Sequence, residues 1–191
     1  MSEERDKVAL TPSIGHFYAW PLVLVTCADA DLKPNIITLG ASAPCSSTPP
    51  TIGIAVAPAR YSHHLIAERG EFGVNIPRAA DLQKVDLCGC ISGRDRDKFA
   101  ETGFTAIPGA VISVPLIAEC PVNLECRLLH TANLGSHDWF IGEIVAARAD
   151  ADLVDTQGRV DSEKLSGVFS WWGRYCTPGD RLQEWGFAGR Q

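Results

Sequence analysis

The feature that most constrains the fold is a pair of long β-type segments separated by a short turn. They are VNLECRLLHTAN at 122–133 and WFIGEIVAARAD at 139–150, with the turn at LGSH between them. Both segments are rich in apolar and β-branched residues, which favours strands. Two such runs around a turn predict an antiparallel hairpin, so we expect a protein built mainly on an antiparallel sheet.

Shorter segments upstream have the same character, and strands are predicted there at four places: 21–29, 35–43, 51–58 and 71–77. Between residues 44 and 50, three prolines remove backbone donors and fix φ, which predicts irregular structure. A short helix is predicted after Ser62, a good N-cap, with Gly70 as its stop. Two more helices are predicted at 79–89 and 97–103.

The order of these elements predicts the fold class. The sequence indicates six strands, mostly in hairpin order, with two or three small helices between them. Strands do not alternate regularly with crossover helices, so we expect a mainly β protein, an antiparallel barrel with small α insertions. The absence of G-x-G-x-x-G and G-x-x-x-x-G-K-[ST] motifs argues against a Rossmann domain and a P-loop.

Size and charge limit the function. The chain has 191 residues, 46% hydrophobic and 21% charged, as expected for a single globular domain over 1–191. The net charge of −6 argues against binding nucleic acid. The most apolar stretch, 19–28, is too short to cross a bilayer, and the first ten residues lack the apolar core of a signal peptide. We therefore expect a soluble, cytoplasmic protein.

The cysteines point to the same compartment. There are seven of them, and an odd number argues against a simple disulfide framework. We expect mainly small core residues in a reducing environment. No paired C-x-x-C or H-x-x-x-H spacing occurs, so no metal site is predicted.

The stretch RYSHHLI places Arg60 and Ser62 at a predicted helix start. The first N–H groups of a helix lack intrahelical partners, and the helix dipole leaves partial positive charge there. A phosphate suits such a place, with the Arg60 guanidinium nearby. The alternative is a plain N-cap beside a solvated arginine, and this segment alone favours the alternative.

Three further segments contain candidate ligand-binding or catalytic residues, and each also has a purely structural interpretation. Ser46, Ser47 and Thr48 form a polar run whose free backbone groups could address a flat heterocycle, or form a hydrophilic turn. Lys98, within CISGRDRDKF, could supply a second anion contact, although a mixed-charge loop is usually a solvated surface. His137, at the entry to a strand, could hydrogen-bond a ligand or move a proton near neutral pH, or be a turn residue.

In their order and spacing, these segments resemble one family. The matching words are KPNIITLGASAPCSSTPPTIGIAV, RYSHHLI, GEFGVNIP, CGCISGRDRDKF, PLIAECPVNLEC and LGSHDWFIGEI. They are similar to the flavin reductase-like proteins of the FMN-binding split barrel fold, and among these to the flavoredoxin type. The likeness extends from residue 19 to residue 148, and the C-terminal YCTPGDRL also fits.

The resemblance implies a six-stranded antiparallel split barrel, with a core over 19–150 and a C-terminal extension over 151–191. It also implies a homodimer with one FMN per subunit near the dimer interface. The contacts that it implies are Asn35, Ile36, Ile37 and Thr38 along the flavin, Cys45, Ser46, Ser47 and Thr48 facing the ring, Arg60, Tyr61, Ser62 and His63 at the phosphate, Ser92 and Lys98 as a second contact, and His137 near the ring edge or the nicotinamide.

The function that the resemblance implies is an oxidoreductase. Electrons from NAD(P)H or a redox partner would pass through FMN, with FAD as the alternative flavin, to free flavin, ferric iron or a protein. A non-catalytic FMN-binding electron carrier or sensor is the rival, and there the tryptophan-rich stretch FSWWGRYCTPGDRLQEWGF would cover the ring. Oxidation of pyridoxine phosphate on a related barrel fits the segments less well.

Overall fold

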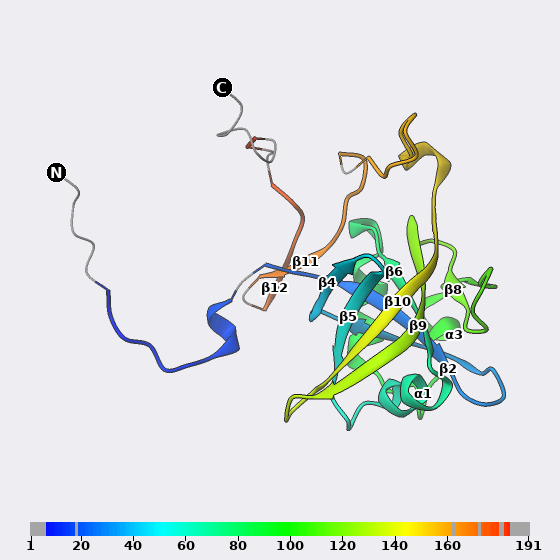
Figure 1. Cartoon of the computed structure of the whole chain (residues 1–191), viewed down its shortest axis with the longest axis horizontal. Helices are drawn as coiled ribbons and strands as arrows, with labels where there is room; N and C mark the ends of the chain where they lie inside the picture. Colours follow the sequence, from blue (N-terminus) through cyan, green and yellow to red (C-terminus); the bar gives the residue numbers. More distant parts are fainter. Residues whose placement is uncertain (1–6, 18, 162, 172, 180–181, 184–191) are drawn as a thin grey trace.

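The structure, a computed structural model, describes residues 7–17, 19–161, 163–171, 173–179 and 182–183. Its main sheet has seven strands in the order β3-β2-β6-β9-β10-β5-β4, and every neighbouring pair is antiparallel. The sheet curls round its core and stays open, with β3 and β4 as its two edges (Figure 1). These strands are β2 (Val23–Ala28), β3 (Pro34–Leu39), β4 (Ser42–Ser47), β5 (Pro50–Val56), β6 (Glu71–Ile76), β9 (Val122–Asn133) and β10 (Asp138–Ala149).

The long hairpin predicted from the sequence is β9–β10, and it forms the middle of the sheet. β9 also pairs with β6, and β10 also pairs with β5, so both strands are flanked on each side. The predicted mainly β, antiparallel split-barrel class is therefore confirmed.

The additional strand is β4, and it corrects the expectation of irregular structure between 44 and 50. β4 pairs with β5 across a turn that contains the cis Thr48–Pro49 peptide bond. Because β4 is an edge strand and its register shifts between Pro44 and Ser46, the prolines remove few donors that a neighbouring strand needs.

The core lies on both faces of β2, all six of whose residues are buried. On one face, Val25 packs in a cluster with Phe72, Phe140 and other barrel residues. On the other face, Leu24 packs with residues of the helices that cover the sheet. A strand covered on both faces reads as a continuous apolar run, which is why the VLV that opens this strand does not alternate with polar residues.

Three helices lie outside the sheet: α1 (Tyr61–Arg69), α2 (Leu82–Cys90) and α3 (Lys98–Thr102). Single 3-10 turns occur at η1 (Ile14–His16), η2 (Ala79–Asp81) and η3 (Ala151–Leu153). The prediction that Ser62 caps α1 was wrong. Arg60 occupies the N-cap position without a side-chain cap, and Ser62 is buried within the first turn.

Two arms extend from the barrel (Figure 1). The N-terminal arm carries η1 and ends in β1 (Trp20–Pro21), which pairs with β11 (Phe169–Trp171) of the C-terminal arm. β11 in turn pairs with β12 (Arg174–Cys176). Together they form a small three-stranded sheet that joins the two ends of the chain.

A buried carboxylate holds the segment between α3 and β9, which contains β7 (Ala106–Ile107) and β8 (Leu116–Ile117). Glu125 is 1% exposed. It accepts hydrogen bonds from three successive backbone N–H groups and one guanidinium: Ala110 at 2.8 Å, Val111 at 2.7 Å, Ile112 at 3.0 Å and Arg148 at 3.0 Å. Burial by itself would raise the pKa of Glu125, but these hydrogen bonds outweigh it and hold the pKa at about 2.

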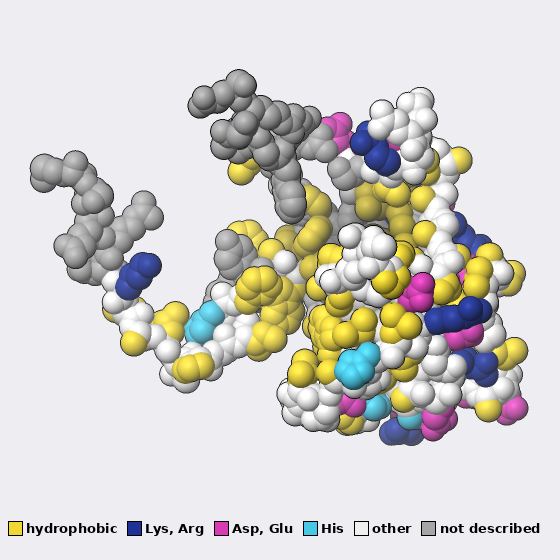
Figure 2. Space-filling model, viewed as in Figure 1, with side chains coloured by type: hydrophobic (Ala, Val, Ile, Leu, Met, Phe, Trp, Pro, Cys, Tyr) yellow, Lys and Arg dark blue, Asp and Glu magenta, His cyan; other side chains and the backbone are white. Residues whose placement is uncertain are grey.

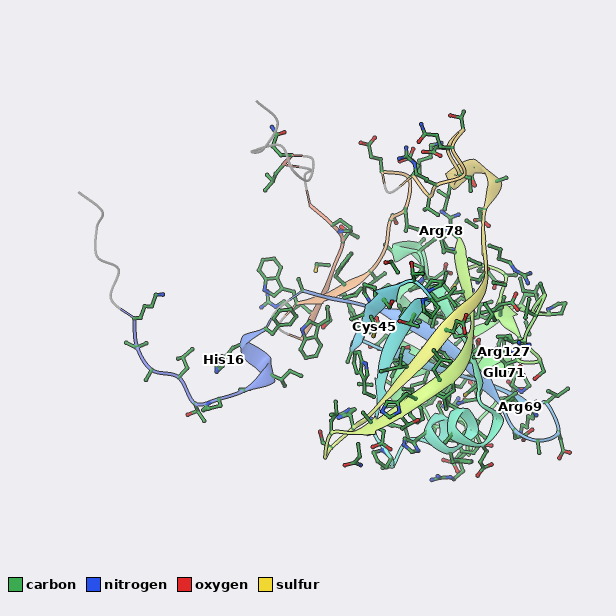
Figure 3. The ribbon with its side chains drawn as sticks, in the orientation of Figure 1. His16, Cys45, Arg69, Glu71, Arg78 and Arg127 are labelled. Atoms are coloured by element: carbon green, nitrogen blue, oxygen red, sulfur yellow. The ribbon has the colours of Figure 1, made fainter. Side chains whose placement is uncertain are left out.

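A second carboxylate supports the same segment from the barrel surface. Glu71 accepts hydrogen bonds from the Ser113 backbone N–H at 2.8 Å and from the Ser113 hydroxyl at 2.6 Å. Figure 3 shows Arg69, Glu71 and Arg127 side by side at this end of the barrel. Among the described residues, no helix is long and apolar enough to cross a membrane.

Candidate functional site

A polar pocket of about 280 Å³ lies where the start of α1 faces β3 and the loop after α2. Three cationic side chains line it, from three separate segments: Arg60, Arg94 and Lys98. One carboxylate, Asp95, also lines it. The pocket thus carries a surplus of positive charge in a chain whose formal net charge is −6.

Lys98 is the unusual member of this set because it is only 4% exposed. Its ammonium donates a 2.6 Å hydrogen bond to the Cys88 carbonyl, and no carboxylate among the described residues lies within 4.0 Å of it. Burial lowers the pKa of Lys98 below its ordinary value. Burial also raises the pKa of the neighbouring Cys27 and Cys88 thiols to about 11, so neither supplies a negative charge at neutral pH.

Asn35 has a buried side-chain atom without a hydrogen-bond partner in the same pocket. It is 3% exposed, and its Nδ2 donates to Ser62 Oγ at 2.7 Å, while its Oδ1 has no partner among the described residues. Turning the amide round would leave Nδ2 unpaired in the same place. Buried polar groups normally find a partner, so an orphaned one that lines a pocket indicates a ligand.

Gly93 permits the loop to lie this close to Asn35. A Cβ built at Gly93 would lie 1.9 Å from Asn35 Oδ1, a distance that no side chain can occupy. The absence of a side chain therefore brings the loop backbone against the buried amide and shapes the wall of the pocket.

The start of α1 completes the anion environment. The N-cap Arg60 makes no side-chain cap, and of the first-turn N–H groups that of His63 donates to the Arg60 carbonyl at 3.0 Å, so those of Tyr61 and Ser62 are the ones available to an anion. Arg94 lies over the Tyr61 ring, with its guanidinium carbon 5.7 Å from the ring centroid. A buried ammonium, exposed guanidinium groups and a helix start together match a phosphate group, whereas the Asn35 Oδ1, an acceptor, suits a donor group of a ligand.

A second pocket of about 230 Å³ adjoins the first, since Ile37, Arg60 and Gly89 line both. Its floor is a run of β3 that includes Thr38, and the side chain of His137 reaches it from the turn before β10. Thr38 Oγ1 donates to the Val85 carbonyl at 2.5 Å, which fixes β3 against α2. A groove along an extended backbone, next to a pocket suited to phosphate, suits a flat ring. We therefore call this second pocket the ring pocket.

The structure brings most of the sequence-predicted residues to these two pockets: Asn35, Ile37, Thr38, Arg60, Tyr61, Ser62, Ser92, Lys98 and His137. Ile36 lies in the core instead, and His63 pairs with Asp138 at 2.7 Å. Cys45, Ser46, Ser47 and Thr48 are exposed on the β4–β5 hairpin and line neither pocket. Cys45 is labelled on this strand in Figure 3. Their contact with a flavin stays a prediction.

The sequence reasoning missed several lining residues. Gly89, Gly93 and Trp20 line the pockets, and the sequence analysis assigned them no role. For Gly93 the sequence did contain a signal, because in ISGRDRDK this glycine directly precedes a cluster of cationic residues. Nothing local to Trp20 shows that it lies near β3, because that proximity comes from tertiary structure.

The fold is that of a split-barrel protein, and its two adjoining pockets could hold a phosphate and a flat ring. The comparison with protein families agrees with this. Residues 14–164 match the flavin reductase like domain, and the chain belongs to the flavin reductase-like family.

Similar proteins support the assignment. The structure of flavoredoxin from Desulfovibrio vulgaris (Miyazaki F) superimposes with a TM-score of 0.86 at 33% identity, covering 95% of this chain and 100% of that one. The uncharacterised protein YddH of Escherichia coli is 35% identical over 167 residues, 85% of this chain and 88% of its own. A Stutzerimonas stutzeri protein named FMN reductase (NADH) RutF is 28% identical over 125 residues, 62% of this chain and 68% of its own.

Proposed function

We propose that the protein is an oxidoreductase that binds FMN and passes electrons from NAD(P)H or a redox partner to an acceptor. Free flavin, ferric iron and a partner protein are the candidate acceptors, and FAD is the alternative flavin. The main support for the proposal is the buried Lys98 ammonium, which has a carbonyl partner but no anionic partner within the described part of the chain. The name of the Stutzerimonas stutzeri relative supports the same activity.

The residues of the pockets fit FMN and divide its binding between them. Lys98, Arg60 and the Tyr61 and Ser62 N–H groups of α1 would neutralise the phosphate, and the Ser62 hydroxyl, whose oxygen accepts from Asn35, would donate to it. The backbone of β3 would support the ring. Bound FMN supplies hydride acceptance at N5 and electron release in one or two steps.

The protein's own part in the reaction is to bind, orient and shield. His137, whose Nδ1 lies 3.0 Å from Ser136 Oγ, stands at the open side of the ring pocket. There it would hydrogen-bond the ring edge or an incoming nicotinamide. The chemistry of bound FMN requires no nucleophilic side chain, which agrees with the lack of a G-x-S-x-G motif in the sequence.

We propose in addition that the protein is a homodimer with the flavin near the interface. Apolar side chains gather along the arms (Figure 2). On the N-terminal arm Val8 and Leu10 are 82% and 64% exposed. Apolar surface of this kind favours an interface with a second copy, which would also bring the β4–β5 hairpin residues toward a flavin. The seven free cysteines support a cytoplasmic location.

Anaerobic reduction tests the proposed activity directly. The purified protein, loaded with FMN, should lose its yellow absorbance promptly when NADH or NADPH is added without oxygen. Addition of free flavin, a ferric chelate or oxygen should then restore the colour and identify the acceptor. A protein that cannot be loaded with FMN would contradict the proposal.

The electron-carrier alternative predicts a yellow protein that stays oxidised with either nicotinamide. In that alternative the tryptophan-rich C-terminal stretch would cover the ring. None of the described residues of β11 and β12 lines the ring pocket in this chain, so the structure gives the alternative no specific support.

A further inference from the structure

An apolar pocket of about 490 Å³ adjoins the ring pocket on the side away from the phosphate end. Trp20, Gly40 and Ala41 line both pockets, so the two are continuous. The volume lies within the range of ~300–1,000 Å³ typical of small-molecule sites. The charge of the three adjoining pockets therefore changes in order, from cationic through mixed to apolar.

The described residues that line this apolar pocket include no ionisable side chain. Its walls are the arm residues Ile14 and Phe17, the tryptophans Trp20 and Trp139, and small residues of β4 such as Ala43. Transfer of a charged ligand into such surroundings is unfavourable, because nothing there can replace its water. A neutral ligand is therefore favoured.

Two tryptophans give the pocket its shape. A Cβ built at Gly53 would lie 2.2 Å from the Trp139 indole, so the missing side chain at Gly53 is what allows Trp139 to lie flat against β5. Trp20 stands at the junction with the ring pocket. Flat aromatic walls favour a planar ligand.

Trp20 also carries an unmet hydrogen bond. Its indole Nε1 is buried and has no partner among the described residues. An indole N–H is a donor only, so the group that it lacks is an acceptor, for example a carbonyl oxygen.

We propose that this pocket binds a neutral, planar aromatic carbonyl compound of the quinone class beside the flavin ring. A carbonyl oxygen of this compound would accept a hydrogen bond from the Trp20 N–H. The evidence for the binding site is the apolar pocket itself. The assignment of the quinone as electron acceptor rests on the proposed function. The reaction balances as NAD(P)H, one proton and the quinone giving NAD(P)⁺ and the hydroquinone, with one hydrogen of the hydroquinone coming from the hydride and the other from that proton, taken from solvent.

Calorimetric titration of the oxidised, FMN-loaded protein with 2-methyl-1,4-naphthoquinone, with no electron donor present, tests the site without turnover. We expect saturable binding, and little or none of the anionic 1,2-naphthoquinone-4-sulfonate. Trp20→Phe keeps an aromatic ring but removes the N–H, and it should weaken naphthoquinone binding about 3- to 10-fold. Trp171→Phe, outside the pocket, is the matched control and should leave binding unchanged.

A second variant keeps the test decisive if Trp20→Phe folds poorly. Ala43→Asp places a carboxylate in the pocket from an edge strand and should abolish naphthoquinone binding, whereas Leu129→Asp, on the exposed part of β9, should not. Equal binding of the neutral and the sulfonated quinone would overturn the proposal. So would an absence of naphthoquinone binding combined with dissociation of a dimer by Ala43→Asp, because the pocket would then be an interface.

The same titration separates this inference from the proposed function. Naphthoquinone binding that depends on Trp20, in a protein that NAD(P)H does not reduce, would leave the pocket assigned and refute the proposed activity. Prompt reduction of FMN by NAD(P)H without naphthoquinone binding would keep the activity and refute the pocket.

Discussion

Among the described residues, two charged side chains are buried, Glu125 and Lys98, and they are satisfied in opposite ways. Glu125 accepts three backbone N–H hydrogen bonds and one from Arg148, all from its own chain. Lys98 donates a hydrogen bond to one backbone carbonyl and pairs with no carboxylate among the described residues. A buried charge that the chain satisfies fully serves the fold, whereas one that the chain leaves without a counter-charge is available to a ligand.

Replacement of Glu125 should have the greatest consequence for stability. Glu125→Gln removes the charge and leaves N–H donors and Arg148 poorly paired, so the free energy of unfolding should fall by about 3 kcal/mol. Lys98→Met removes a buried cation that has no anionic partner, so the flavin-free protein should stay within about 1 kcal/mol of the native value. Urea denaturation of both variants measures the difference, and equal losses would contradict the assigned roles.

The two buried charges should affect the pH dependence of stability in opposite ways. The folded pKa of Glu125, at about 2, lies below its usual 4.5. Its contribution of about 3 kcal/mol is therefore present above pH 4.5 and is lost as the pH falls toward 2. Acid titration of native protein and Glu125→Gln, followed by circular dichroism, should show the two stabilities converging in this window.

For Lys98 the sign reverses. Its folded pKa is lowered, so the cost of burying the ammonium is full below that folded pKa and falls as the pH rises toward 10.5. The flavin-free protein should thus gain stability over this alkaline range relative to Lys98→Met. Bound FMN should remove the gain, because its phosphate favours the charged ammonium.

Loss of the Arg60 guanidinium should have a more modest consequence, for flavin affinity. Arg60→Ala should weaken FMN affinity by about 1.5–3 kcal/mol, the range for hydrogen bonds to charged groups. Arg96→Ala is a matched control, because Arg96 pairs with Glu101 at 2.6 Å and does not line the pocket. Flavin fluorescence titration measures both, and an unchanged affinity for Arg60→Ala would place the phosphate elsewhere.

The smallest effect tests the shape of the pocket. Gly93→Ala sets a Cβ against Asn35 Oδ1, and because the loop is at the surface it should shift and weaken FMN binding by about 1 kcal/mol. Gly167→Ala is the control, since its Cβ would make an ordinary 3.9 Å contact with Phe169. Equal affinities for the two variants would show that the close approach at Gly93 has no part in binding.

Sequence reasoning predicted the parts of this molecule that depend on local pattern. The β9–β10 hairpin follows from alternation and a turn, and the residues from Arg60 to Ser62 reach the pocket as their position at a helix start suggests. It failed where tertiary position decides. The prolines of β4 are tolerated because that strand is an edge, and Ser62 bonds Asn35 rather than capping its helix.

The partners of the two buried charges could not be predicted from sequence at all. Whether Lys98 or Glu125 has partners depends on segments that are distant along the chain, such as the Cys88 carbonyl or the Arg148 guanidinium. The sequence shows both simply as charged residues near apolar ones.

The central claim is that the counter-ion missing at Lys98 is the phosphate of FMN. Calorimetric titration of flavin-free protein and Lys98→Met with FMN and with riboflavin, which lacks the phosphate, tests this most directly. The native protein should bind FMN at least about 100-fold more tightly than riboflavin, and Lys98→Met should lose about 10-fold or more of that preference while binding riboflavin as before. Equal affinity of the native protein for the two flavins would contradict the account.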